Sequence, residues 1–242
     1  MPEPQKTHRE VKNPQISVRY LADFMAGSHR AQRSIVRLCK YQPIARVVQH
    51  DEAKAAVSKI IRDAGKDSAG LKAKAQELRA RLADSEFDRD LFDHNADYID
   101  RFAAVLGGLV LPDAERLPPG NVQSTKVKAV KVNLDLQFRL RRLTKTNKVR
   151  VGGGMLRYAK GKALDPDVGA WQSAFLFGHL NGSPPEDGAG AEHKLCLTID
   201  AYAGEAFAAP GDATNRYKNM CAACETIAEW WPNITPPPNA KF

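Results

Sequence analysis

The sequence predicts an α+β protein with an N-terminal helical region followed by a β-hairpin-plus-helix domain. Apolar residues recur at intervals of three and four through residues 17–108, which is the spacing of amphipathic helices. Over residues 130–141 every second residue is apolar, which is the spacing of a strand with one buried face. The change of period separates a helical region from a region that contains a sheet.

Five helices are expected in the helical region. Ser17 and Ser28 are candidate N-caps for the first two, and Ser85 with Asp88 resembles a capping box for the last. Glycines, or a proline at Pro43, follow several of the expected ends. The expected helices cover about residues 18–26, 29–41, 51–64, 71–82 and 86–106.

The second region is expected to contain a basic hairpin, two further strands and two helices. Its first strand is the alternating segment, and residues 145–148 resemble a turn. The glycines at 152–154 lack the spacing of a phosphate-binding loop, so we interpret them as a bulge or turn. Pro166 after Asp165 is well placed to begin a helix. The remaining elements are expected at residues 148–151, 166–182, 195–201, 205–209 and 213–231.

These elements divide the chain into five segments. Residues 109–125 contain three prolines and Gly120 without a sustained period, so they are expected to link two domains. The N-terminal residues lack the apolar segment of a secretory signal and are expected to form a solvated tail. The expected segments are a flexible tail (1–16), a helical domain (17–108), a linker (109–125), an α+β domain with the basic hairpin (126–234) and a Pro-rich tail (235–242).

Basic residues are concentrated in one part of the chain. Residues 126–162 hold twelve Lys and Arg and a single acid, Asp135, which amounts to +11, whereas the whole chain carries +8. The other 205 residues therefore sum to −3. Such a concentration repels itself unless an anionic partner neutralises it, and nucleic acid is the commonest such partner.

The candidate nucleic-acid contacts fall into three groups. One is the strand and turn of the basic hairpin, and the second is the sequence RYAKGK at 157–162, where an aromatic ring could stack on a base. The third is a basic stripe on the second helix, which with the preceding helix resembles a helix-turn-helix. The candidates are Arg30, Arg33, Arg37, Lys40, Arg139, Arg141, Arg142, Lys145, Lys148, Arg157, Tyr158, Lys160 and Lys162.

Two carboxylate sets suggest a nuclease as an alternative. Asp167, Glu192 and Lys194 match the residue types with which restriction-type nucleases hold Mg²⁺ and stabilise charge. Asp135 and Asp200 form a second possible pair, although their spacing does not join them. An acid at Asp167 is also expected simply because it favours the N-terminal end of a helix.

The cysteines allow a zinc site on paper. His193, Cys196, Cys221 and Cys224 form an H-x2-C…C-x2-C pattern. Because Cys221 and Cys224 lie on an apolar helix face, we interpret them as core side chains and expect no metal. Four cysteines are sparse for 242 residues, which favours a reducing cytoplasm over a disulfide framework.

The sequence therefore favours a nucleic-acid-binding, non-catalytic subunit of a cytoplasmic complex, without a cofactor. A role in bacterial defence or mobile-element biology is a further hypothesis. A protein-interaction subunit, whose hairpin docks on an acidic partner, remains an alternative beside the nuclease. DNA and RNA are not distinguished. No membrane partner is expected, because no segment approaches the ~18–20 apolar residues of a transmembrane helix.

Overall fold

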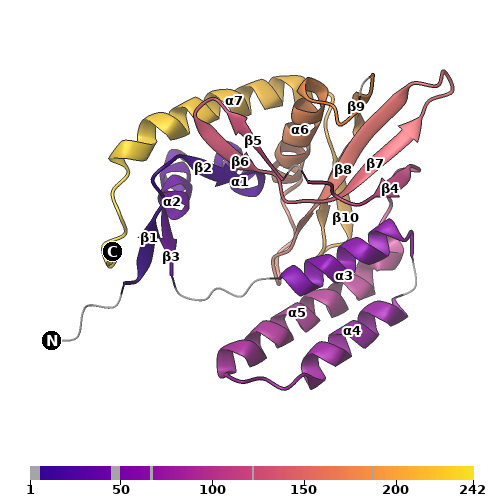
Figure 1. Ribbon diagram of the computed structural model, residues 1–242, viewed down its shortest axis with the longest axis horizontal. Coiled ribbons are helices and arrows are strands. Elements are labelled where there is room, and N and C mark those ends of the chain that lie inside the picture. The colour runs from indigo at the N-terminus through magenta and orange to yellow at the C-terminus, as the bar shows by residue number, and fades with distance from the viewer. Residues whose placement is uncertain (1–5, 45–49, 66–67, 122, 187) are drawn as a thin grey trace.

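Seven α-helices and ten strands make up the described part of the computed structural model, which covers residues 6–44, 50–65, 68–121, 123–186 and 188–242 (Figure 1). The expected α+β class is confirmed. The helices are α1 (Val18–Ala26), α2 (His29–Lys40), α3 (Asp51–Arg62), α4 (Ala69–Ala80), α5 (Glu86–Val105), α6 (Pro166–Gly182) and α7 (Ala213–Trp230). The strands are β1 (His8–Glu10), β2 (Gln15–Ser17), β3 (Tyr41–Pro43), β4 (Glu115–Leu117), β5 (Ser124–Val127), β6 (Val130–Asn133), β7 (Leu136–Leu143), β8 (Val149–Arg157), β9 (Gly190–Asp200) and β10 (Glu205–Ala208). None of the described helices reaches the length and hydropathy of a membrane-spanning segment.

Side-chain caps explain where several helices begin. The hydroxyls of Ser17, Ser28 and Ser85 each accept a hydrogen bond from the backbone N–H three residues later. Pro166 occupies the first turn of α6, and the Asp165 carboxylate caps this helix by accepting a hydrogen bond from the N–H of Asp167. Each of these groups satisfies or removes a backbone donor that the first helical turn leaves unpaired. The four starts predicted from the sequence are therefore confirmed.

The central sheet has the strand order β10–β9–β8–β7–β4. β8 and β9 are parallel and are joined by α6, whereas the other neighbours are antiparallel. A parallel pair requires such a crossover connection, and a helix usually provides it. The β7–β8 hairpin extends from this sheet, and α3, α4 and α5 form a separate layer beside it (Figure 1).

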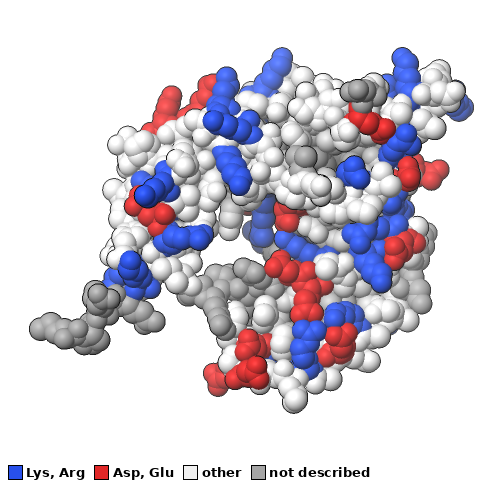
Figure 2. Space-filling model, in the orientation of Figure 1, with Lys and Arg blue, Asp and Glu red and all other residues white. Residues whose placement is uncertain are grey.

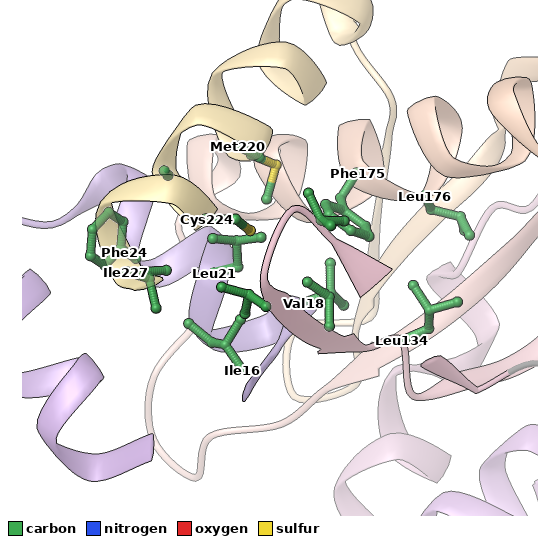
Figure 3. Close-up of a cluster of buried hydrophobic side chains, with 14 of the residues drawn as sticks. Ile16, Val18, Leu21, Phe24, Leu134, Phe175, Leu176, Met220, Cys224 and Ile227 are labelled. Atoms are coloured by element: carbon green, nitrogen blue, oxygen red, sulfur yellow. The ribbon is translucent and has the colours of Figure 1, made fainter. Parts of the chain in front are cut away.

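Two apolar cores lie on opposite faces of the central sheet. Met155 and Cys196 belong to the first core, and their neighbours Leu156 and Leu197 belong to the second, as the alternation of a strand requires. The first core gathers side chains from α1, α2, α6 and α7, and Figure 3 shows those of α1, α6 and α7 around Val18 and Phe175. The second joins α3, α4 and α5 to the sheet. The first two helices thus share a core with the C-terminal half of the chain, although the sequence grouped them with α3–α5.

Segments expected to be tails or linker contribute strands. β1 lies inside the expected 1–16 tail and pairs with β3, and β2, which begins in this tail, pairs in parallel with β6. At the other end of the chain the carbonyl of Lys241 accepts from the N–H groups of Thr7 and His8. The expected linker 109–125 contains β4 and the start of β5. These pairings join residues far apart in sequence, so local composition does not reveal them.

The alternating segment 130–141 forms two strands where the sequence predicted one. Asp135 lies between β6 and β7 with a φ of 53°, a left-handed conformation that Asp tolerates better than most residues. Its carboxylate accepts hydrogen bonds from Lys54 at 2.6 Å and from Gln137 at 2.8 Å. β6 belongs to the small β2–β6–β5 sheet and β7 to the central sheet. The apolar alternation continues through this break, so the sequence pattern gave no sign that the strand is interrupted.

The glycine run lies inside β8, which continues to Arg157 and does not end at residue 151. A register shift against β9 occurs between Val151 and Gly153, in agreement with the expected bulge. A Cβ added at Gly154 would lie 2.1 Å from a ring carbon of Phe138. The glycines therefore allow close packing between strands, and no turn is present here.

Candidate nucleic-acid interface

The tip of the β7–β8 hairpin presents two free cations. The turn is closed by hydrogen bonds in which the N–H of Lys148 donates to the Thr144 hydroxyl and the N–H of Thr144 donates to the Lys148 carbonyl. Asn147 adopts a φ of 55°, as a tight turn requires. Lys145 and Lys148 are exposed, and no carboxylate of the described residues lies within 4 Å of either ammonium group. Figure 2 shows Lys and Arg side chains along this side of the molecule, with acidic side chains between them.

The arginines nearer the base of the hairpin are already ion-paired. Arg141 donates to Glu186 at 2.9 Å and lies 3.6 Å from Glu115. The hydrogen bond with Glu186 raises the pKa of Arg141. Arg142 forms a two-point ion pair with Glu192 across the sheet. The positive charge of the hairpin is therefore smaller than the sequence count implies, although exposed ion pairs of this kind contribute little to stability and exchange easily for phosphate.

Arg139 faces a cavity at the base of the hairpin. Its Nε donates to the carbonyl of Pro118 at 2.8 Å, which leaves its two terminal nitrogens without a hydrogen-bond partner among the described residues. Arg139, Arg141 and His179 line this cavity of about 630 Å³ together with leucine side chains. Burial lowers the pKa of His179, so this imidazole is neutral at pH 7.

The sequence RYAKGK separates into buried and exposed residues. Arg157 has a side chain only 10% exposed, and it donates to Asp23 at 2.7 Å and to the carbonyl of Arg19. Lys160 pairs with Asp97 at 2.8 Å but remains 65% exposed. Lys162 is exposed and has no acidic neighbour within 4 Å in the described chain. Arg157 thus holds the fold together, whereas the two lysines stay accessible.

Tyr158, which belongs to the same RYAKGK sequence, is not free in solvent, because its ring stacks on that of Tyr98. Their ring centroids are 3.9 Å apart and the ring planes differ by 5°. Tyr158 also lines a cavity of about 250 Å³ beside His50, His94 and Asp97. The two histidines lie 44 positions apart in the sequence and no local pattern joins them, so they could not be predicted to share a site.

Most of the basic stripe on α2 packs against the C-terminal segment. Lys40 is buried and donates to the carbonyl of Trp231 at 2.9 Å. Arg37 donates to the carbonyl of Thr235, and Arg33 lies over the Trp230 ring at 5.6 Å. Among the four candidates of this helix, Arg30 is exposed and its side chain makes no hydrogen bond, ion pair or ring contact with another described residue. The stripe is therefore mainly a packing surface, because the chain returns from α7 across it.

The nuclease candidates Asp167 and Glu192 are each paired with a different arginine. Asp167 accepts from Arg216 at 2.7 Å and from the indole N–H of Trp171, whereas Glu192 is paired with Arg142. Lys194 is exposed. Within the described ranges no three His, Cys, Asp or Glu side chains converge as metal ligands would.

The second carboxylate pair is also occupied. Asp135 is paired with Lys54. Asp200 is buried, and its two oxygens accept the backbone N–H groups of Leu164, Tyr202 and Ala203. A carboxylate that accepts three backbone hydrogen bonds orders the loop around it, and this accounts for its burial.

The cysteines behave as core side chains. Cys196 and Cys224 are buried, and burial raises the pKa of Cys224 to about 12. His193 lies against the Phe177 ring at 3.9 Å, and its Nδ1 is 2.7 Å from the carbonyl oxygen of Pro210. Buried thiols and an imidazole that lies against an aromatic ring are in the surroundings of core side chains.

No protein-family model and no curated protein matches this sequence. Function therefore has to follow from geometry and charge. Of the thirteen candidate contacts, the exposed cations with no acidic neighbour in the described chain are Arg30, Arg33, Lys145, Lys148 and Lys162, of which Arg33 lies over the Trp230 ring. Lys145 and Lys148 lie together at the tip of the hairpin.

Proposed function

We propose that this protein binds nucleic acid, without a reaction of its own, through phosphates held by the β7–β8 hairpin. The observation that carries the proposal is the pair Lys145 and Lys148, exposed on a projecting turn with no acid within 4 Å among the described residues. Unpaired cations on a β-ribbon are suited to phosphate contacts, since they release counterions when they bind.

The arginines of the hairpin strengthen the same surface. Arg139 retains free guanidinium N–H groups, and the half-exposed pairs of Arg141 and Arg142 can exchange a carboxylate for a phosphate. These groups point to backbone contacts and not to a set that reads base edges. Binding should therefore depend strongly on salt and weakly on sequence.

The proposed setting is a reducing cytoplasm, where the protein acts as one subunit of a larger complex. All four cysteines are free thiols, which supports a reducing compartment. The acidic side chains between the cations, among them Glu115 and Glu186, lower the net charge of the surface. A hairpin of this kind binds phosphate more weakly alone than with additional contacts from a partner subunit.

The experiment is fluorescence anisotropy with single- and double-stranded DNA and RNA at two salt concentrations. Mg²⁺ is present, and the probes are run afterwards on a denaturing gel. We expect wild type to bind with marked salt dependence, Lys145→Ala/Lys148→Ala to bind more weakly, and every probe to stay intact. Absence of binding to all four probes would contradict the proposal, and cleaved probes would replace it with a nuclease.

A further inference from the structure

A cavity of about 250 Å³ lies where α3, α5 and the end of β8 meet. Its lining consists of His50, His94, Asp97, Tyr158, Ala159 and Lys160. His50 directly precedes α3, and His94 and Asp97 lie three residues apart on α5, hence on one face of that helix. The other three follow β8 directly. Three elements that are distant in sequence therefore build one small site.

The aromatic wall of this cavity is rigid. Tyr98 is 1% exposed and stacks in parallel on one face of Tyr158. The His50 ring meets both tyrosine rings edge-on at 5.5 Å, and Tyr202 meets Tyr158 at 6.1 Å. Among the described residues no second ring lies parallel to Tyr158, since the Tyr202 ring meets it at an interplanar angle of 60°. A ring held in this way offers a stacking surface whose ordering is complete before a ligand arrives.

The polar groups of the cavity are also fixed. Lys160, at 2.8 Å, and Arg79, at 3.0 Å, hydrogen-bond the Asp97 carboxylate and lower its pKa, so it stays ionised and accepts further N–H donors. Burial lowers the pKa of His50, and the nearby His94 adds to the effect, so this imidazole is uncharged at pH 7. Lys160 is the exposed cation at the rim.

We infer that this cavity holds one unpaired nucleobase of a nucleotide, stacked on Tyr158, with Asp97 accepting from the base and Lys160 beside its phosphate. The inference rests on the proposed function and specifies it, since it adds an unpaired base to the phosphate contacts of the hairpin. The volume lies below the ~300–1,000 Å³ of cavities for drug-sized ligands, so it suits one ring system and no more. Bases with an exocyclic amino group should bind better than uracil or thymine, because they donate more hydrogen bonds to a carboxylate.

The distance between this cavity and the hairpin tip sets a length requirement. Lys148 and Tyr158 stand at opposite ends of β8, ten residues apart, which is about 33 Å for an extended strand. Stacked nucleic acid rises about 3.4 Å per nucleotide, so roughly ten stacked nucleotides span this distance. Much shorter oligonucleotides should engage one site only.

The test measures the binding of two kinds of ligand, free mononucleotides and an oligonucleotide, to four proteins. The probes are the free mononucleotides AMP, GMP, CMP and UMP, followed by calorimetry, and a 16-nucleotide single strand with one 2-aminopurine, followed by fluorescence. The proteins are wild type, Tyr158→Leu, Ala159→Leu and Lys145→Ala/Lys148→Ala. Ala159 is exposed, so a larger side chain there blocks the cavity without disturbing a core. Thermal unfolding checks that each variant is folded.

We expect 2-aminopurine to be quenched by wild type, and Tyr158→Leu and Ala159→Leu to weaken oligonucleotide binding about 5- to 150-fold, which is the range for loss of one base stack. AMP, GMP and CMP should bind wild type and the hairpin variant equally. Binding of the mononucleotides without the oligonucleotide would support the cavity and overturn the hairpin proposal. Oligonucleotide binding that both cavity variants retain, without quenching, would overturn the cavity and leave the hairpin proposal standing.

Discussion

Arg157 at the end of β8 donates a hydrogen bond to Asp23 of α1 at 2.7 Å, and this pair ties the central sheet to the N-terminal helices. The sequence placed Arg157 among the phosphate contacts. Its guanidinium also donates to the carbonyl of Arg19 and to Gln172, so its N–H groups are committed inside the fold. Burial lowers the pKa of Arg157, but the neighbouring Asp23 carboxylate opposes this shift and keeps the pair charged.

Arg157→Ala should destabilise the protein. Removing one partner of a fully buried pair costs about 3–5 kcal/mol, and because Asp23 is 30% exposed we expect about 2–3 kcal/mol here. Arg157→Lys should recover little, since an ammonium group cannot reach three acceptors in a planar fork. Urea unfolding measures both, with exposed Lys162→Ala as a control expected within about 0.5 kcal/mol of wild type. Equal stability of Arg157→Ala and the control would contradict this role.

The glycines of β8 should resist substitution. In Gly154→Ala the new Cβ meets the Phe138 ring at 2.1 Å, and overpacking of this kind costs about 1–3 kcal/mol or more. Gly70→Ala is the matched control, because no neighbouring atom lies within 4 Å of a Cβ added at Gly70 and alanine favours the helix by roughly 0.5–1 kcal/mol. Thermal unfolding should therefore show opposite shifts in Tm for the two variants. A Gly154→Ala protein as stable as wild type would show that β7 and β8 are packed less closely than the distance to Phe138 indicates.

Asp200 should act on stability and not through a metal. In Asp200→Asn an amide NH₂ replaces one acceptor facing the N–H groups of Leu164, Tyr202 and Ala203, and we expect a loss of about 2–3 kcal/mol. Asp167→Asn, in an exposed ion pair, should cost less than about 1 kcal/mol. Differential scanning calorimetry with and without Mg²⁺ measures the Tm of wild type and of both variants. An increase in Tm with Mg²⁺ that Asp200→Asn abolishes would instead indicate a metal site.

Three of the four cysteines should be unreactive in the folded protein. Cys39, Cys196 and Cys224 are buried, and burial raises the pKa of Cys39 and Cys224 to about 12, so almost no thiolate forms at pH 8. Cys221 is half-buried and should react with iodoacetamide slowly. Mass spectrometry should find one modified thiol in native buffer and four in denaturant. Rapid native labelling of Cys196 or Cys224 would mean that the first core opens.

Local features of the fold were predictable, and long-range ones were not. The hydroxyls of Ser17, Ser28 and Ser85 act within one helical turn, so their sequence context is sufficient. The parallel pairing of β2 with β6 joins residues more than a hundred positions apart. No periodicity encodes that pairing, so the sequence grouped α1 and α2 with α3–α5, whereas their buried side chains belong to the first core. Asp135 interrupts a strand without interrupting its polar alternation.

The candidate site shows the same limit. A count of charges identified the hairpin, because Lys145 and Lys148 lie together in sequence as well as in space. It could not show that Lys40 and Arg157 are buried, since their acceptors are backbone carbonyls and carboxylates on distant segments. The His50 and His94 cavity had no sequence signal, because its walls come from three separate elements.

The salt dependence of nucleic-acid binding shows whether the hairpin contacts phosphates. The dissociation constant for a duplex probe is measured between about 50 and 200 mM salt for wild type, Lys145→Ala/Lys148→Ala, and a control that removes two exposed lysines elsewhere, Lys72→Ala/Lys218→Ala. Each lost phosphate contact lowers the slope of log Kd against log salt by about 0.9. The slope for the hairpin variant should therefore be about 1.8 smaller than the slope for wild type. The control should keep the wild-type slope. One common slope for all three proteins would contradict phosphate binding by the hairpin.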